Sequence, residues 1–462
     1  MSTATLAPAP LVTPAERPAE KPVPSRAPER RRWTSQPYVL MTLVALLLRV
    51  GVIIFGRTYL FPSIVRFTYA PELHNFMFGY ETGSIARNIA VGHGFSSPFG
   101  IFTGPTAWIA PLYTYLCAGI FKLFGVYSQE SAIIILIINS LFSALTCVTI
   151  YKIAERTVGR TVGLWAGWAW AVVPFFMRWP TTWVWEISLS ALLMSSLFLY
   201  TLHLEKSSSR KLWAGYGLLW AVAALSNPAL LAALPFMGLW AALRLRRRGQ
   251  DYFRPAALSA LMFLLAITPW LVRNRIALGQ WVFIRDNFAL ELRLGNYSSS
   301  NGMGWLGRHP TWNKWQLEKY AQMGELAYLE ENQREALEFI RSQPVAFSVL
   351  CGKRFLGFWD GTPLIYHSKE PWKPWMFILT SVLALYGLVA AIGHKIHASW
   401  LYALVLLTYP IPYYLTYVQP RYRHAIEPLL LILIVYFLWE TILNFRRRFT
   451  KTELGRLAFT KS

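Results

Sequence analysis

The sequence predicts an all-α polytopic membrane protein with about ten to eleven transmembrane helices and a first outer loop that carries juxtamembrane helices. Of its 462 residues, 55% are hydrophobic and only 15% are charged, a balance that soluble proteins of this length rarely have. The formal charge of +22 comes from short basic clusters between apolar runs, which is the distribution of topology signals. A nucleic-acid-binding protein would instead carry its basic residues along one polar face.

Apolar runs of the roughly 17 to 25 residues that cross a bilayer predict about ten spans. They lie near 37–56, 131–151, 161–178, 186–204, 211–226, 228–243, 256–272, 374–393, 399–417 and 425–444. A further run, 106–125, is ambiguous. If it lies at the outer surface as a juxtamembrane or re-entrant helix, every strong basic connection falls on the same side as the basic N-terminal tail, as the positive-inside rule expects. We therefore predict that this run does not cross.

The chain divides into one integral membrane domain and two tails. Residues 1–34 are rich in Pro, Ala, Glu and Arg, so we expect a disordered cytoplasmic tail. Residues 35–445 form the membrane domain, with outer loops at about 57–130 and 273–372, and residues 446–462 form a basic cytoplasmic tail. The first apolar run starts too late and is too long for a cleavable signal peptide. Three cysteines without regular spacing do not indicate a disulfide framework or a zinc site.

A single acid stands out in the first outer loop, in the stretch FGYETGSIARNIAVGHGF at residues 78–95. On a helix, Glu81 shares one face with Ser84, Ile85 and Asn88. A carboxylate that faces a cavity at the membrane surface can act as a general base. An acid at a helix N-terminus can also simply interact with the free N–H groups there. The residues alone leave both interpretations open.

Four further residues are candidates for substrate binding. Asn88 lies on the same helix face as the acid, and His93 stands between two glycines, in a turn that either approaches a ligand or is an ordinary loop. Arg49 lies about 10 Å inside the outer end of the first span, where an arginine is either functional or snorkels outward. Glu186, at the outer start of a span, is either an interfacial carboxylate or a second acid.

Four stretches carry a family resemblance: the acid before IARNIAVGHGF, then PLYTYLCAGIFKLFGVYS, then TPWLVRNRIALGQW at 268–281, and QPRYRHAIEPLLL at 419–431. They resemble the polyprenyl-phosphate-sugar glycosyltransferases of the GT-C superfamily, in the branch of protein O-mannosyltransferases and bacterial aminoarabinose transferases (glycosyltransferase family 39-like). The resemblance covers most of residues 37–445. In the family pattern the acidic pair falls near Phe78 and Gly79, so Glu81 stands one helical turn later, and Trp108 to Ala110 replace a second loop acid.

The resemblance implies that the predicted helices form a GT-C-like bundle. It also implies a multi-pass enzyme of the bacterial inner (cytoplasmic) membrane, with a cytoplasmic N-terminus and an active site on the outer face. It would transfer a sugar from a polyprenyl-phosphate donor to a lipid, glycan or protein acceptor by inverting single displacement, with Glu81 as base. The candidates for binding the donor phosphate are the outer basic residues Arg421, Arg423, His424, Arg273 and Arg275, and more weakly Lys353 and Arg354. Snorkelling to lipid headgroups is the alternative role of these cations.

Metal use and two other functions stay open. A lone loop acid makes a poor divalent site, so a metal cofactor is neither required nor excluded. A lipid or sugar transporter or flippase would be expected to carry internal repeats and midplane charges, and we find no convincing repeat. A noncatalytic relative of the same fold would account for the shifted position of the acid.

Overall fold

The computed structural model describes residues 36–61, 77–302, 304, 306–361 and 372–459. Within these ranges the protein is almost entirely helical, and the only pairing of extended chain is an isolated β-bridge between Ser96 and Pro105. The predicted all-α membrane fold class is confirmed. The predicted disordered tail, 1–34, lies outside the described residues.

Seven helical segments of the described chain are long and apolar enough to cross a membrane, and each coincides with a predicted span. They are α1 (Pro37–Phe55), α4 (Gln129–Thr157), α7 (Ile187–Leu204), η3 (Pro228–Ala233) with α9 (Leu234–Arg247), α10 (Phe253–Leu278), α16 (Trp372–Gly393), and η5 (Pro420–Ile426) with α19 (Glu427–Phe459). The long helix α4 is central, because it packs against α1 and α7 and also contacts α19.

The other three predicted spans are short or broken helices. α8 (Arg210–Ser226) has 17 residues. The run 161–178 becomes α5 (Arg160–Val172) and α6 (Pro174–Thr182), and the run 399–417 becomes α17 (Ser399–Thr408) and α18 (Ile411–Leu415). A proline stands at each break, Pro174 and Pro410. Proline has no N–H to continue the helix, which accounts for an interruption at each position. At the first break the residue before the proline, Val173, also leaves helical backbone, with φ −75° and ψ 123°.

The ambiguous run 106–125 forms α3 (Pro111–Phe124). Its 14 residues give a helix of about 21 Å at 1.5 Å per residue. This is shorter than the roughly 30 Å of a bilayer's hydrocarbon core, which agrees with the prediction that the run does not cross. α3 packs against α2 (Glu81–Ala90), the helix that begins at the acid of the first loop.

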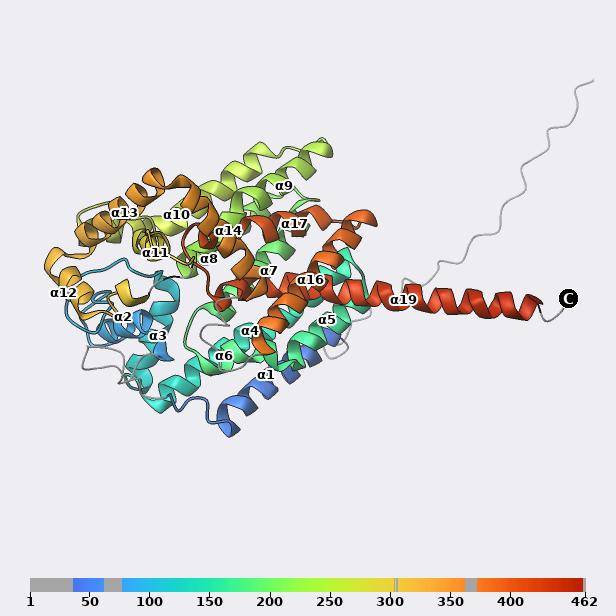
Figure 1. The fold of residues 1–462 in the computed structure, drawn as a ribbon, viewed down its shortest axis with the longest axis horizontal. Coiled ribbons are helices and arrows are strands. Elements are labelled where there is room, and N and C mark those ends of the chain that lie inside the picture. The colour runs from blue at the N-terminus through green and yellow to red at the C-terminus, as the bar shows by residue number, and fades with distance from the viewer. Residues whose placement is uncertain (1–35, 62–76, 303, 305, 362–371, 460–462) are drawn as a thin grey trace, which may run out of the picture.

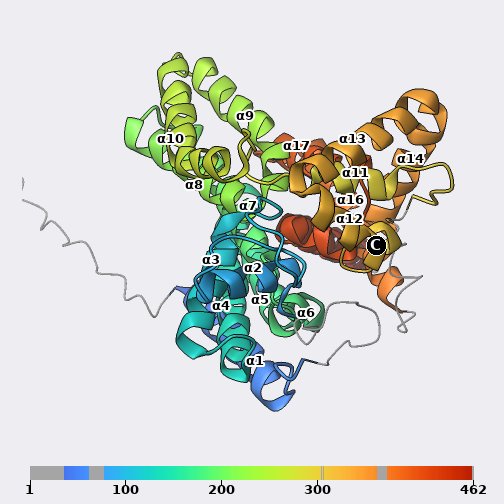
Figure 2. The ribbon, with the colours of Figure 1, turned by 90° about the vertical axis from the view of Figure 1, so that its left-hand side faces the viewer.

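The two predicted outer loops pack together into a helical cap at one end of the bundle, on the left in Figure 1 and facing the viewer in Figure 2. The second loop contributes α11 (Phe288–Gly295), η4 (Leu306–Arg308), α12 (Lys314–Met323), α13 (Glu325–Ser342) and α14 (Pro344–Asp360). The buried carboxylate of Glu325 joins the loops, because it accepts hydrogen bonds from the backbone N–H of Ala107 (2.6 Å) and from the hydroxyl groups of Thr106 and Tyr320.

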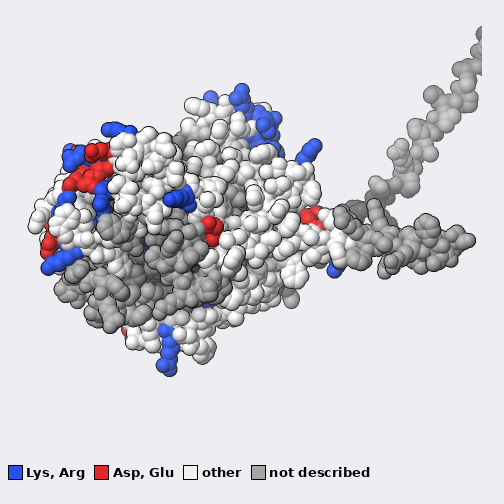
Figure 3. Space-filling view, viewed as in Figure 1, with Lys and Arg blue, Asp and Glu red and all other residues white. Residues whose placement is uncertain are grey.

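Charge is distributed unevenly over this architecture. Lys and Arg side chains gather over the end of α9, where Arg244 and Arg246 to Arg248 lie, whereas acidic and basic side chains mix over α13 in the cap (Figure 3). The surface between them in this view is mostly uncharged. This is the pattern of a membrane protein whose strongly basic connections lie at the end of the bundle opposite the cap.

The contact between α8 and α10 depends on a glycine. A methyl group added at Gly217 would meet the backbone oxygen of Ser259 at 2.0 Å. Small residues allow two helix backbones to pack in close contact in a membrane. Here the atom that the methyl group would meet belongs to the backbone, which cannot rotate away as a side chain can.

We expect Gly217→Ala to lower the midpoint of thermal unfolding in detergent, at a cost of roughly 1–3 kcal/mol for overpacking. Gly238→Ala on α9 is the matched control, because nothing lies within 4 Å of its added methyl group. Equal midpoints for the two variants would contradict this account of the α8–α10 contact.

Candidate active site

A cavity of about 890 Å³ opens between the cap and the membrane bundle. Its walls come from the starts of α2 and α3, the chain that leads into α7 and the start of α7, and the junction of α8 with η3. The loop before α11, the loop before α12, and the chain from the end of α17 to η5 complete them. Much of the wall is aromatic, which leaves few polar side chains to interact with a ligand. Those that carry charge or can gain it are Glu81, Arg178, Glu186, Arg285, Glu291, His309 and Arg421, together with several tyrosines.

Glu81 is the first residue of α2, and a tight turn aims it at the cavity. Gly79 has a φ of 73°, and a methyl group there would meet the backbone oxygen of Val184 at 2.4 Å, so the turn requires glycine. The hydroxyl of Thr311 donates a hydrogen bond to Glu81 Oε1 at 3.2 Å. The predicted helix face is largely buried, and Asn88 donates to the backbone oxygen of Ser96 at 2.9 Å rather than reaching the cavity.

The environment of Glu81 gives it the pKa of a useful base. Burial raises the pKa of this carboxyl group to about 7, although its own backbone N–H, the charge of Arg421 and the Thr311 hydroxyl oppose the rise. Glu291, across the cavity, adds to the rise. A carboxyl group with this pKa exchanges its proton close to neutral pH, which suits a general base.

Arg421 brings a positive charge to the same cavity. Its guanidinium lies over three aromatic rings, with its central carbon 4.3 Å from the ring centre of Trp185, 5.3 Å from that of Tyr422 and 5.6 Å from that of Trp183. Within the described chain no carboxylate lies within 4 Å of it, and its Nε has no hydrogen-bond partner. Aromatic faces therefore hold this cation while leaving it available to an anion.

The neighbours of Arg421 on η5 point elsewhere. Arg423 donates to the hydroxyl of Ser381 (2.9 Å) and the backbone oxygen of Phe377 (3.1 Å), and His424 Nδ1 lies 2.5 Å from Glu427 Oε2. Neither Arg423 nor His424 lines the cavity. A 3₁₀ helix has three residues per turn, so the side chain of Arg423 leaves η5 in another direction than that of Arg421. His424 is three residues after Arg421, on the same side of the helix, but its ring is held by Glu427. Only Arg421 of these three predicted phosphate ligands therefore lines the cavity.

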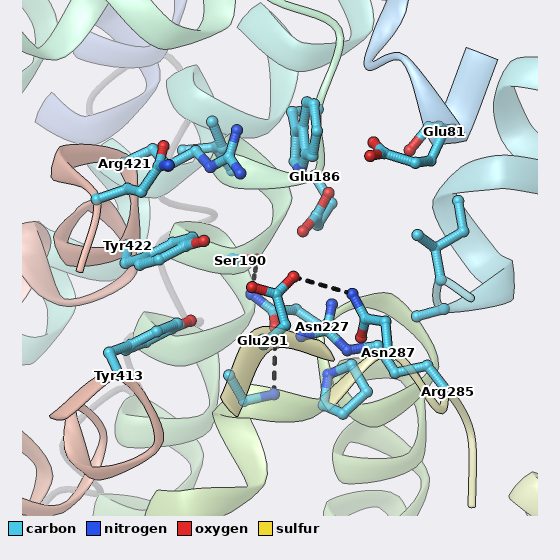
Figure 4. A pocket seen from close by; sticks show the side chains of 18 of the residues that line it. Glu81, Glu186, Ser190, Asn227, Arg285, Asn287, Glu291, Tyr413, Arg421 and Tyr422 are labelled. Carbon is cyan, nitrogen blue, oxygen red and sulfur yellow. Dashed lines mark hydrogen bonds between the residues drawn. The ribbon is translucent and has the colours of Figure 1, made fainter. Parts of the chain in front are cut away.

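A second polar group of side chains occupies the middle of the cavity (Figure 4). Glu186 precedes α7, and Glu291 on α11 accepts a hydrogen bond from Asn287 Nδ2 at 3.1 Å. Arg285 lines the same region, and its charge opposes the rise that burial causes in the pKa of Glu291. In the view of Figure 4, Glu186 lies between Arg421 on one side and Glu81 on the other.

Two predicted site arginines instead donate their hydrogen bonds to buried oxygen atoms of the protein, most of them backbone carbonyl oxygens. Arg49 is fully buried and donates to Ser143 Oγ and to the carbonyl oxygens of Ala45, Trp170 and Ala171 at 2.9–3.1 Å. Arg354 is 2% exposed and donates at 3.0–3.2 Å to the carbonyl oxygens of Gly302, Tyr414 and Leu415 and to the amide oxygen of Asn296. Neither lines the cavity.

The remaining predicted residues also lie outside the cavity. Arg273 donates to the carbonyl oxygens of Phe95 and Thr106 at 2.6 Å, so it stabilises the backbone of the first loop. Arg275 bonds the carbonyl oxygen of Gly279 at the end of its own helix. His93 and Lys353 are exposed. The structure thus brings together Glu81, Glu186 and Arg421 from the predicted set and adds Arg285, Glu291, His309 and Thr311, which no sequence motif marked.

The described residues include no group of three or more His, Cys, Asp and Glu side chains placed to hold a metal ion. The positive charge that faces this cavity comes from arginine side chains.

Comparison with known proteins agrees with this architecture. Residues 108–272 match the model of the dolichyl-phosphate-mannose-protein mannosyltransferase family. The chain also aligns with the crystal structure of the Archaeoglobus fulgidus oligosaccharyltransferase in complex with zinc and sulfate, with a TM-score of 0.50, 15% identity, and coverage of 90% of this chain and 51% of that one. The chain has a GT-C fold. The resemblance predicted from the sequence is confirmed, and the chain spans about half the length of that oligosaccharyltransferase.

Another GT-C protein is also similar: the crystal structure of ArnT from Cupriavidus metallidurans bound to undecaprenyl phosphate, with a TM-score of 0.40, 13% identity, and coverage of 87% of this chain and 76% of that one. No curated protein matches the sequence. The matched segment 108–272 contains Glu186 but begins after Glu81 and ends before Arg421, so the family match does not extend to these two residues.

The contacts of Arg354 predict a structural role. We expect Arg354→Leu to lower the thermal unfolding midpoint, because each buried acceptor left without a donor costs roughly 1–3 kcal/mol. Lys353→Leu is the matched control, since its side chain is the exposed neighbour on the same helix. Thermal unfolding in detergent measures both variants, and a smaller loss for Arg354→Leu than for Lys353→Leu would contradict the assignment.

Proposed function

We propose that this protein is a membrane glycosyltransferase that moves one sugar from a polyprenyl-phosphate donor to an acceptor by inverting single displacement. The observation that carries the proposal is the placement of Glu81 and Arg421 on one aromatic-walled cavity, a carboxyl group with a pKa near 7 facing the same space as a cation that no carboxylate neutralises within 4 Å in the described chain. These are the two functions that displacement at a sugar phosphate requires of an enzyme.

In the proposed step, an acceptor hydroxyl or amine attacks the anomeric carbon of the sugar. Glu81 takes the proton of the attacking group, the new bond to the sugar forms, and the bond from the anomeric carbon to the phosphate oxygen breaks. The polyprenyl phosphate leaves with the electron pair of that bond, and Arg421 stabilises its added negative charge. Because the attacking and leaving groups lie on opposite faces, the configuration at the anomeric carbon inverts.

The membrane setting is part of the proposal. The basic connections at the end of α9 are the strongest cytoplasmic signals, and the cap that covers the cavity lies at the other end of the bundle. We therefore place the cavity at the outer face of a bacterial inner membrane, with the N-terminus in the cytoplasm. The isoprenoid chain of the donor would remain in the membrane, and the acceptor, a lipid, a glycan or a protein, would approach from outside.

The first test is sugar transfer by purified protein from radiolabelled polyprenyl-phosphate sugars extracted from the host membrane. We expect Glu81→Gln to retain donor binding but to lose roughly 10²–10⁴-fold in turnover, the usual contribution of a general base. Arg421→Gln should instead weaken donor binding itself. Glu338→Gln, an exposed acid on α13, is the control for the loss of one carboxylate.

Transfer by Glu81→Gln at the wild-type rate would show that the Glu81 carboxylate is structural, and Glu186 would then be the acid to test. Donor transport across vesicles without any transfer would favour a flippase. Wild-type protein that binds the donors but transfers none of them would favour a noncatalytic relative.

The pKa of Glu81 also predicts the pH dependence of turnover. The ionised carboxylate is the base, so we expect the rate to increase as the pH rises through about 7 and to level off above it. The Thr311 hydroxyl stabilises the ionised form, so Thr311→Val should move this rise to higher pH. A pH–rate profile of the two proteins measures the shift, and a shift to lower pH would contradict it.

A further inference from the structure

His309 is the least expected side chain beside Glu81. It precedes α12, its side chain is only 8% exposed, and its ring packs edge-on against Phe99 and Trp108, with ring centres 5.8 and 6.0 Å away. Its Nε2 lies 3.7 Å from Glu81 Oε1. No motif in the sequence marks this residue, yet both of its ring nitrogens have a defined neighbour.

The backbone fixes which nitrogen of His309 carries the proton. The backbone N–H of Thr311 donates a hydrogen bond to His309 Nδ1 at 3.2 Å. An amide N–H can only donate, so Nδ1 must offer its lone pair, and a neutral imidazole then has its single proton on Nε2. Burial, helped by the charge of Arg421, lowers the pKa of His309 to about 3, so the ring is neutral at physiological pH.

The Nε2 proton therefore faces the carboxylate of Glu81. The same Oε1 accepts a hydrogen bond from the Thr311 hydroxyl at 3.2 Å. The short loop before α12 therefore directs two donors, His309 Nε2–H and the Thr311 hydroxyl, at one oxygen of Glu81. Its third donor, the backbone N–H of Thr311, fixes the histidine ring. At 3.7 Å the histidine contact is longer than a hydrogen bond. Contacts of this kind commonly shorten when substrate fills an active site.

We propose that His309 is a positioning residue that directs its Nε2–H at Glu81, holds the carboxylate towards the acceptor, and takes no proton itself. The inference rests on the proposed function in one respect, the role of Glu81 as base. Two other roles are incompatible with the geometry. A base needs a free lone pair, but Nδ1 is occupied and Nε2 already carries hydrogen. A metal bound at Nε2 would require hydrogen on Nδ1, directed at the N–H of Thr311.

The charged groups around this pair come from three elements. Glu81 lies on α2, Arg421 on η5 and Glu291 on α11, and all three line the cavity with His309. Arg421 disfavours a charged imidazole, whereas Glu81 and Glu291 would favour one. The ring is buried, which disfavours its charged form, and the N–H of Thr311 occupies the lone pair of Nδ1, so the neutral form prevails.

The direct test is nitrogen NMR of purified protein with ¹⁵N-labelled histidine. His309→Gln assigns the signals of this residue, because they disappear in the variant. We expect an unprotonated Nδ1 and a protonated Nε2 that do not change between pH 5 and pH 8. A proton on Nδ1, or titration of the ring in this range, would overturn the proposal. This readout does not depend on sugar transfer, so it judges His309 even if the proposed enzyme activity fails.

The kinetic test compares two substitutions. His309→Phe keeps a ring between Phe99 and Trp108 but removes the donor, and His309→Gln keeps an N–H that can reach towards Glu81. We expect turnover to fall roughly ten- to a hundredfold in His309→Phe, the range for one hydrogen bond to a charged group, with the donor KM unchanged and the pH profile moved to higher pH. His309→Gln should recover part of the loss.

Three outcomes would overturn the proposal. Wild-type turnover and pH profile in His309→Phe would show that the donor is unnecessary. A shift of the profile to lower pH would show that His309 destabilises the ionised carboxylate. Loss of wild-type transfer on chelation, restored by a divalent metal only when His309 is present, would make the residue a ligand. Unfolding midpoints of both variants within a few degrees of wild type are the condition for the comparison.

Discussion

The cost of placing a charge away from water governs this structure. An arginine in an apolar setting needs acceptors for five N–H groups, and each group left without one is expensive. Arg49 meets the requirement at the end of α5, where Pro174 prevents the helix from continuing and leaves the carbonyl oxygens of Trp170 and Ala171 without helical partners. Arg354 does the same at the end of α18, on the carbonyl oxygens of Tyr414 and Leu415. Broken helices and buried arginines stabilise each other.

Arg421 is held in a different way, and this difference explains why it belongs to the site. Its charge rests on the faces of Trp183, Trp185 and Tyr422, which attract a cation without accepting hydrogen bonds in the manner of carbonyl oxygens. A cation held by rings keeps its capacity to bind an anion, whereas one held by carbonyl oxygens has used it. Burial is the main cause of the pKa shifts of Glu81 and His309, and the charge of Arg421 acts on both groups: it opposes the rise in the pKa of Glu81 and adds to the fall in the pKa of His309.

The sequence predicted the fold better than the site, for a physical reason. Hydropathy locates helices because apolar length is a local property, and the prolines that break two spans are visible in the sequence. The sequence also marks Glu81, as a lone acid in the first outer loop, and Glu186 and Arg421, as charges at the outer starts of spans. Rare charge equally marks Arg49, Arg273 and Arg354, because the sequence does not indicate where a loop or an interrupted helix leaves carbonyl oxygens for them. Glu291, Arg285 and His309 were missed because the contact of Glu325 with the first loop, which brings the cap over the cavity, joins segments more than 200 residues apart.

The shifted position of the acid has an explanation in the turn before α2. The register that the family resemblance assigns to the acidic pair falls at Phe78 and Gly79. Phe78 is 3% exposed and packs edge-on against Phe61 and Phe121, so its side chain belongs to the core of the bundle. Gly79 lies against the backbone of Val184, where no side chain fits. An acid at either position would be buried in apolar contacts or would open the turn. Glu81 is the first acid whose side chain faces the cavity, so in this chain the turn moves the carboxylate along the helix rather than removing it from the site.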